Sequence, residues 1–126
     1  MSYGLPPLYK KPRRKKRLTG REPVRSPTHR AWVRRHECVV PACNGEYHPE
    51  AHHAKTKGAG GGDEWCVSLC RMHHVGLGGV HQGGRRTFME RYGIDLEAIA
   101  KRFAEASPDQ KIREAAKTMR WNERRR

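Results

Sequence analysis

Four residues, arranged as two close pairs, constrain this chain more than any other feature. Cys38 and Cys43 flank four residues in "CVVPAC", and Cys70 and His73 flank two in "CRMH". The 26 residues 44–69 separate the two pairs. Two such pairs offer the thiolate and imidazole ligands that tetrahedral Zn²⁺ takes. We therefore expect Cys38, Cys43, Cys70 and His73 to bind a structural Zn²⁺.

Two alternatives stay open for these cysteines. Cys66 could pair with Cys70 across three residues, or the four cysteines could be ordinary reduced thiols. Clustered cysteines in an intracellular chain favour metal or catalysis over disulfides. A chain of 126 residues with 35% hydrophobic and 32% charged residues cannot bury a large core. Zinc would supply stability that apolar burial lacks.

The net charge of +14 is concentrated at the two ends of the chain. Residues 1–35 hold twelve Lys and Arg against Glu22 alone, which gives +11, and residues 111–126 add +5. Residues 36–110 come to −2. Basic segments bind polyanions because each Lys or Arg on a phosphate releases a counterion. We expect a nucleic acid partner, the alternative being a solubilising or ribosome-adherent tail.

The ends of the chain also bear on its location. Residues 1–25 combine four prolines with "KKPRRKKR" and show no apolar periodicity, so we expect a disordered basic arm. No stretch approaches the roughly 20 apolar residues of a membrane span. The first residues lack the apolar segment of a secretory signal. These patterns predict a soluble, intracellular protein with no membrane association.

Capping residues and periodicity predict the ordered elements. Ser26 can cap a first helix that has Pro27 in its first turn. "EWCVSLC" alternates like a strand and would pair with another around residues 47–53. "CRMHHV" would open a helix, and the glycines at 76, 78 and 79 would interrupt it.

Helices dominate the C-terminal third of the sequence. Gly93 should end one helix, and Asp95 should cap "LEAIAKRFAEA", whose Leu96, Ile99 and Phe103 share a face. Ser107 should cap the last helix, with Pro108 at its first position and Gln110 completing a capping box.

Two histidine doublets indicate a second site. Adjacent positions on a helix are turned about 100° apart, so His74 should point away from a zinc held by His73. His52 and His53 should likewise face opposite sides of their strand. One member of each doublet could therefore converge on a second site, which would contain His74, His81 and one or both of His52 and His53.

The sequence resembles the HNH, or ββα-metal, endonucleases over about residues 26–109. The resemblance rests on "RAWVRRHECVVPAC", "EAHHAKTKGAGGGDEWCVSLCRMHHVGLGGVHQGG" and "FMERYGIDLEAIAKRFAEASPD". It is greatest to small phage and prophage proteins that include recombination-enhancing nucleases. It implies a small α+β fold: a β-hairpin and helix around one catalytic divalent cation, such as Mg²⁺ or Mn²⁺, often with a zinc beside it. Residues 26–92 would form this nuclease domain, and residues 93–126 a C-terminal helical extension with a basic end.

The resemblance also implies roles for single residues. His53 matches the general base, for which an imidazole with an ordinary pKa of about 6.5 is suited. His52, His74 and His81 match the ligands of the catalytic cation. The family's central Asn is missing: "GGDEWC" has Asp63, Glu64 or Trp65 there, and Asp63 or Glu64 would orient the base instead. His74 and His81 are also further apart than is usual.

The activity implied is hydrolysis of DNA phosphodiester bonds, leaving a 5′ phosphate and a 3′ hydroxyl. Nothing in the sequence resembles a base-reading recognition helix, so we expect low sequence specificity. The setting would be the cytoplasm of a bacterial host, with a recombination or phage DNA-processing protein as partner. Alternatives are a zinc-stabilised nucleic-acid-binding or recombination accessory protein without catalysis, and a ribosome-associated zinc-ribbon protein. The basic residues expected to contact DNA are Lys10, Lys11, Arg13, Arg14, Lys15, Lys16, Arg17, Lys55, Lys57, Arg124, Arg125 and Arg126.

Overall fold

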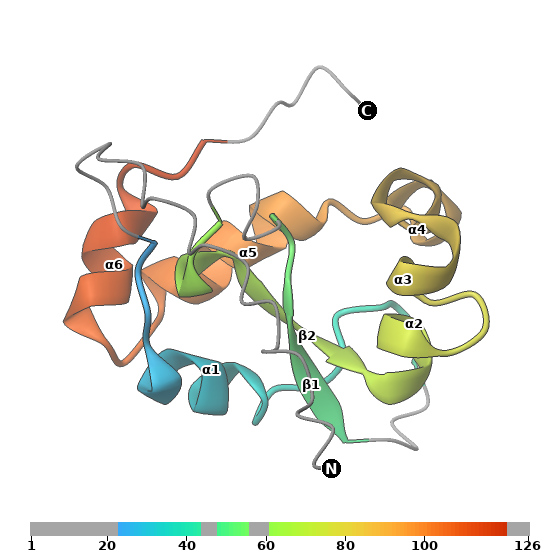
Figure 1. Cartoon of the computed structure of the whole chain (residues 1–126), viewed down its shortest axis with the longest axis horizontal. Helices are drawn as coiled ribbons and strands as arrows, with labels where there is room; N and C mark the ends of the chain where they lie inside the picture. Colours follow the sequence, from blue (N-terminus) through green and yellow to red (C-terminus); the bar gives the residue numbers. More distant parts are fainter. Residues whose placement is uncertain (1–22, 44–47, 56–60, 121–126) are drawn as a thin grey trace, which may run out of the picture.

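A two-stranded antiparallel sheet crosses the middle of the molecule, with helices around it (Figure 1). The computed structural model describes residues 23–43, 48–55 and 61–120. Strand β1 (Pro49–His53) pairs with β2 (Cys66–Cys70). The expectation of a small α+β fold is thus confirmed.

The register of the hairpin places the first histidine doublet. His52 pairs with Val67 and His53 with Cys66, and a short 3-10 helix, η2 (Asp63–Trp65), leads into β2. Every residue of β2 is buried, whereas His52 alone is buried in β1. The predicted pairing is confirmed from Pro49 onward, whereas the expected start near position 47 falls outside the described residues.

Helix α1 (Pro27–Val33) begins as predicted. The Ser26 hydroxyl accepts a hydrogen bond from the His29 amide at 3.0 Å, and Pro27 occupies the first turn. Val33 is fully buried, and the Trp32 ring packs edge-on against Phe103, with 5.9 Å between ring centroids. These contacts fix α1 against the C-terminal helices.

Helix α2 (Arg71–Val75) follows β2 without a break, and none of its five residues is buried. It ends at Gly76, and α3 (Val80–Gly83) begins after a tight turn. A Cβ at Gly79 would lie 2.8 Å from the Met72 carbonyl oxygen, so this turn requires glycine. The predicted interruption of the helix by glycines is confirmed.

Helices α4 (Arg85–Tyr92) and α5 (Leu96–Glu105) are joined at Gly93, which adopts a left-handed conformation with φ of 64°. Asp95 caps α5 by accepting from two backbone amides of its first turn. Both expectations are confirmed.

The start of the last helix was predicted wrongly. Helix α6 (Gln110–Ala116) is capped by Asp109, not Ser107, and Pro108 precedes the helix. The Ser107 hydroxyl instead accepts from the Asp109 amide at 3.1 Å and contacts the His29 ring nitrogen Nδ1 at 2.8 Å. The hydroxyl is engaged in this turn, which leaves the carboxylate of Asp109 to cap α6.

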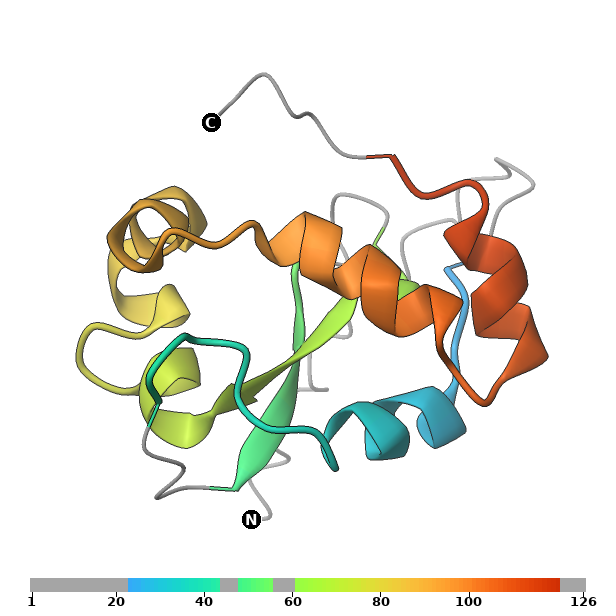
Figure 2. The same cartoon turned by 180° about the vertical axis from the view of Figure 1, so that it is seen from behind.

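The hydrophobic core lies between the hairpin and the C-terminal helices. Figure 2 shows α5 lying across the two strands. Leu96, Ala100 and Ala104 form its buried face, while Ile99 and Phe103 are only half-buried. The core also includes residues of β2, α4 and α6, namely Val67, Leu69, Phe88, Ile112 and Ala116. Residues after Gly93 therefore share one core with the hairpin.

Residues 24 and 25, at the end of the arm expected over residues 1–25, contact the body of the protein. Val24 packs against the core, and its carbonyl oxygen accepts from the Asp63 amide at 2.8 Å. Arg25 lies 3.8 Å from the Asp63 carboxylate. These contacts attach residues 24 and 25 to η2. The rest of the basic run lies outside the described residues. No helix within the described ranges is long and apolar enough to cross a membrane.

Candidate metal centres

The first candidate centre joins the two sequence pairs. The ligand atoms of Cys38, Cys43, Cys70 and His73 all lie within 4.8 Å of one another. His73 Nδ1 is 3.0 Å from Cys70 Sγ and 3.6 Å from Cys38 Sγ, and the sulfurs of Cys43 and Cys70 are 3.8 Å apart. The structure therefore brings together all four residues that the spacing selected.

Two of these three separations match those around a tetrahedral ion, and the 3.0 Å between Cys70 Sγ and His73 Nδ1 is shorter. Sulfurs at about 2.3 Å and nitrogens at about 2.0 Å from Zn²⁺ are separated from one another by roughly 3.5–3.8 Å. The Cys43–Cys70 and Cys38–His73 separations of 3.8 and 3.6 Å lie in this range. All four cysteines are free thiols. The donor set of three sulfurs and one imidazole could therefore hold a metal ion.

Two turns position the ligands. The Cys43 amide donates to the Val40 carbonyl at 3.2 Å, which curls the first pair into a knuckle. The Val39 amide donates to the Ser68 carbonyl at 3.0 Å and ties this knuckle to β2. Burial raises the pKa of the Cys38 thiol to about 11. Metal binding requires the thiolate, so binding would release a proton there.

The second candidate centre consists of three imidazoles from three elements. His52 on β1, His74 on α2 and His81 on α3 place their ligand atoms within 4.8 Å of one another. The Nε2 atoms of His74 and His81 are 3.0 Å apart. The group brings in His81 despite the seven-residue separation, because the glycine turn folds α3 back beside α2.

The three histidines of this group differ in solvent exposure. The His52 side chain is buried and that of His81 exposed. Burial, and then repulsion from His74 and His81, lowers the pKa of His52 to about 3. His52 is therefore neutral near pH 7 and can offer a lone pair. The open side at His81 leaves room for a ligand other than protein.

His53 belongs to a different group from its neighbour His52. Its Nε2 lies 3.0 Å from Asp63 Oδ1, and Asp63 is 1% exposed. Burial alone would raise the pKa of Asp63. The net shift is downward, because the carboxylate accepts hydrogen bonds from the Ser26 amide at 2.7 Å and from His53 and lies near the charge of Arg30. Asp63 is therefore an anion that can accept a hydrogen bond from His53.

Cys66 lies near this pair without being a good ligand. Its sulfur is within 4.8 Å of the His53 and Asp63 ligand atoms. Burial and the negative charge of Asp63 raise its pKa to about 12, so it stays a protonated thiol. Arg25 and Arg30 lie 3.8 and 3.3 Å from the carboxylate and already balance its charge. The described structure groups Cys66 with His53, not with Cys70 as the alternative pairing required.

Of the basic residues expected to contact DNA, the structure describes Lys55. Lys55 Nζ sits 5.3 Å from the centroid of the Trp65 ring, in cation–π range. The remaining basic residues expected to contact DNA lie outside the described residues. Sequence reasoning missed Glu50, whose Oε1 is 3.2 Å from His74 Nδ1. Its position two residues before His52 on a strand was the available signal.

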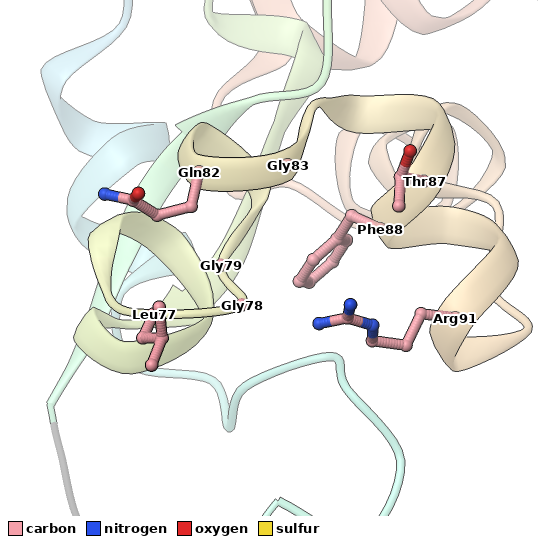
Figure 3. A pocket seen from close by; sticks show the side chains of 8 residues that line it. All are labelled: Leu77, Gly78, Gly79, Gln82, Gly83, Thr87, Phe88 and Arg91. Carbon is pink, nitrogen blue, oxygen red and sulfur yellow. The ribbon is translucent and has the colours of Figure 1, made fainter.

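A separate surface depression lies between α3 and α4 (Figure 3). It has a volume of about 450 Å³, and its walls include Leu77, Gln82, Phe88 and Arg91. Leu77 is 95% exposed at its edge. None of the histidines of the second centre lines this depression.

Comparison of the chain with protein-family models, curated proteins and solved structures finds no match in any of the three.

Proposed function

We propose that this protein is a metal-dependent endonuclease of the HNH kind that hydrolyses DNA phosphodiester bonds with low sequence specificity. The observation that carries the proposal is the open group of His52, His74 and His81, with His53 next to His52 on β1 and paired with Asp63 of η2. The elements β1, β2 and α2 follow in the order of a ββα-metal core. Three protein ligands and an open position are typical of a catalytic metal site.

His53 would act as the general base. Asp63 accepts a hydrogen bond from Nε2–H, which leaves the lone pair of Nδ1 to take a proton from water. The water oxygen attacks phosphorus, a new P–O bond forms, and the bond to the 3′ oxygen breaks. The 3′ oxygen leaves as a hydroxyl after protonation, and the phosphate stays on the 5′ side.

His52, His74 and His81 would hold the divalent cation. When bound, Mg²⁺, Mn²⁺ or a similar ion supplies positive charge to the scissile phosphate and leaving oxygen. The Cys38, Cys43, Cys70 and His73 group would hold Zn²⁺ and fix the start of α2. The basic ends of the chain, at +11 and +5, would contact the DNA backbone. We place the reaction in the cytoplasm of a bacterial host, in phage DNA processing or recombination.

The test is cleavage of supercoiled plasmid and of single-stranded DNA with Mg²⁺, Mn²⁺ or Ni²⁺. His53→Ala should lower the rate by about 10²–10⁴-fold, because general acid–base catalysis contributes this much. The control is His48→Ala, which removes an exposed imidazole just before β1. Equal cleavage by both variants would contradict the role of His53. Absence of cleavage by wild-type protein with all three cations would contradict the nuclease itself.

A second candidate is a zinc-stabilised DNA-binding or recombination accessory protein. Two observations favour it. The central Asn of the HNH family is missing, and the negative charge of Asp63, which stands near that position, is balanced by Arg25 and Arg30. Binding of DNA by the intact chain, without nicking under any of the cations above, would support this candidate.

A further inference from the structure

Glu50 lies on the same face of β1 as the cation ligand His52. The two residues are two positions apart on a strand, and alternate side chains of a strand share a face. Glu50 Oε1 is 3.2 Å from Nδ1 of His74 on α2, and its side chain is 46% exposed. The carboxylate therefore reaches across from the strand to the helix that carries the second ligand.

The two ring nitrogens of His74 have different neighbours. Nδ1 faces the Glu50 carboxylate, whereas Nε2 lies 3.0 Å from His81 Nε2, inside the three-histidine group. A neutral imidazole carries its proton on one nitrogen only, and the hydrogen bond made by one nitrogen decides the state of the other. A carboxylate accepts only from N–H, so the proton belongs on Nδ1 and the lone pair on Nε2.

We propose that Glu50 is the positioning residue of the second centre: it holds His74 in the Nδ1–H form and aims Nε2 at the cation. The inference rests on the cation site of the proposed function and deepens it. Carboxylate partners of this kind orient metal-bound histidines and make them more basic. Glu50 also brings a negative charge beside a group made entirely of imidazoles.

The first test is the tautomer of His74, read by long-range ¹H–¹⁵N NMR on protein loaded with one equivalent of zinc, so that the second centre holds no metal. Wild-type protein should show the Nδ1–H form. Glu50→Ala should shift His74 toward the Nε2–H form, and Glu50→Gln should keep Nδ1–H because its amide oxygen still accepts. The matched control is Glu114→Ala, which removes the same charge from an exposed residue of α6. An unchanged tautomer in Glu50→Ala would overturn the inference.

The second test is Ni²⁺ binding to the same zinc-loaded proteins, measured by calorimetry. Glu50→Ala should bind Ni²⁺ about 10–100-fold more weakly than wild type, the usual cost of losing such a partner. Glu50→Gln should fall between the two, because it keeps the hydrogen bond and loses the charge. Glu114→Ala should bind like wild type. Wild-type affinity in Glu50→Ala would overturn the inference.

The two readouts separate this inference from the proposed nuclease. If wild-type protein binds Ni²⁺ with the expected dependence on Glu50 and cleaves no DNA, the nuclease is wrong and Glu50 keeps its role. If wild-type protein cleaves DNA and Glu50→Ala matches it in both tautomer and affinity, the nuclease stands and the role of Glu50 is wrong.

Discussion

The two candidate centres each take one residue from the short helix α2 and differ in almost every other respect. The Cys38, Cys43, Cys70 and His73 group has four donors, three of them sulfur, with Cys70 buried. The His52, His74 and His81 group has three donors, all nitrogen, with His81 exposed. Closed sets of four are typical of structural zinc, and open sets of three are typical of catalytic ions.

The difference shows how adjacent residues can serve separate purposes. His73 and His74 are neighbours on α2, yet each belongs to a different group. The turn of about 100° between successive helical residues separates them. Removing a ligand from one centre should therefore affect the fold, and removing one from the other should affect ion binding alone.

The largest expected effect is on the closed centre. Cys70→Ser should abolish zinc binding and unfold the protein, because structural zinc contributes about 10–16 kcal/mol, comparable to the total stability of a small domain. Metal analysis and circular dichroism would measure both losses. Cys66→Ala is the matched control, since Cys66 is equally buried but outside the group. A folded, zinc-free Cys70→Ser protein would show that the closed centre is not structural.

A smaller effect is expected at the open centre. His81→Ala should weaken Ni²⁺ binding by more than the roughly 10–100-fold cost of losing an orienting partner, because a ligand itself is lost. The zinc content and melting temperature should stay at wild-type values, since His81 is exposed. His48→Ala serves as the control. Loss of zinc together with Ni²⁺ would show that the two centres are not separable.

The smallest expected effect is at His29, outside both centres, and concerns how the free energy of unfolding depends on pH. Burial lowers the pKa of His29 to about 4, below its ordinary 6.5, so the neutral form is favoured by folding. Stability should fall as the pH drops from 6.5 toward 4, by about 2 kcal/mol at pH 5.

His29→Met should remove this dependence, because methionine does not titrate. Urea unfolding of zinc-loaded wild type and variant at pH 7.5, 6 and 5 gives the difference at each pH. Zinc dissociation affects both proteins alike and cancels in that difference. An identical pH slope in both proteins would contradict the assignment to His29.

The local signals in the sequence predicted much of the fold. Ser26 and Asp95 cap the starts of their helices and Gly93 caps the end of its helix, as expected. Capping depends on groups within a few residues, so the local sequence predicts it. Ser107 failed as a cap because its hydroxyl is engaged by His29, 78 residues away in sequence. Sequence periodicity contains no information about such a distant partner.

The same distinction holds for the candidate sites. Ligand spacing selected Cys38, Cys43, Cys70 and His73, because knuckles are local structures. Other contacts at the sites join residues that are distant in sequence, and local patterns do not predict them. Glu50 reaches His74 only because the hairpin register and α2 bring them together. Asp63 forms ion pairs with Arg25, which precedes α1, and with Arg30, which lies within α1.

Helix α2 has no buried residue, so apolar packing contributes little to its position. If Cys70 and His73 bind zinc, coordination fixes the helix at its first turn and thereby sets the direction of His74. The availability of zinc would then govern the assembly of the second ion site. Zinc would thereby limit any chemistry that depends on the second site, whatever the supply of the second cation.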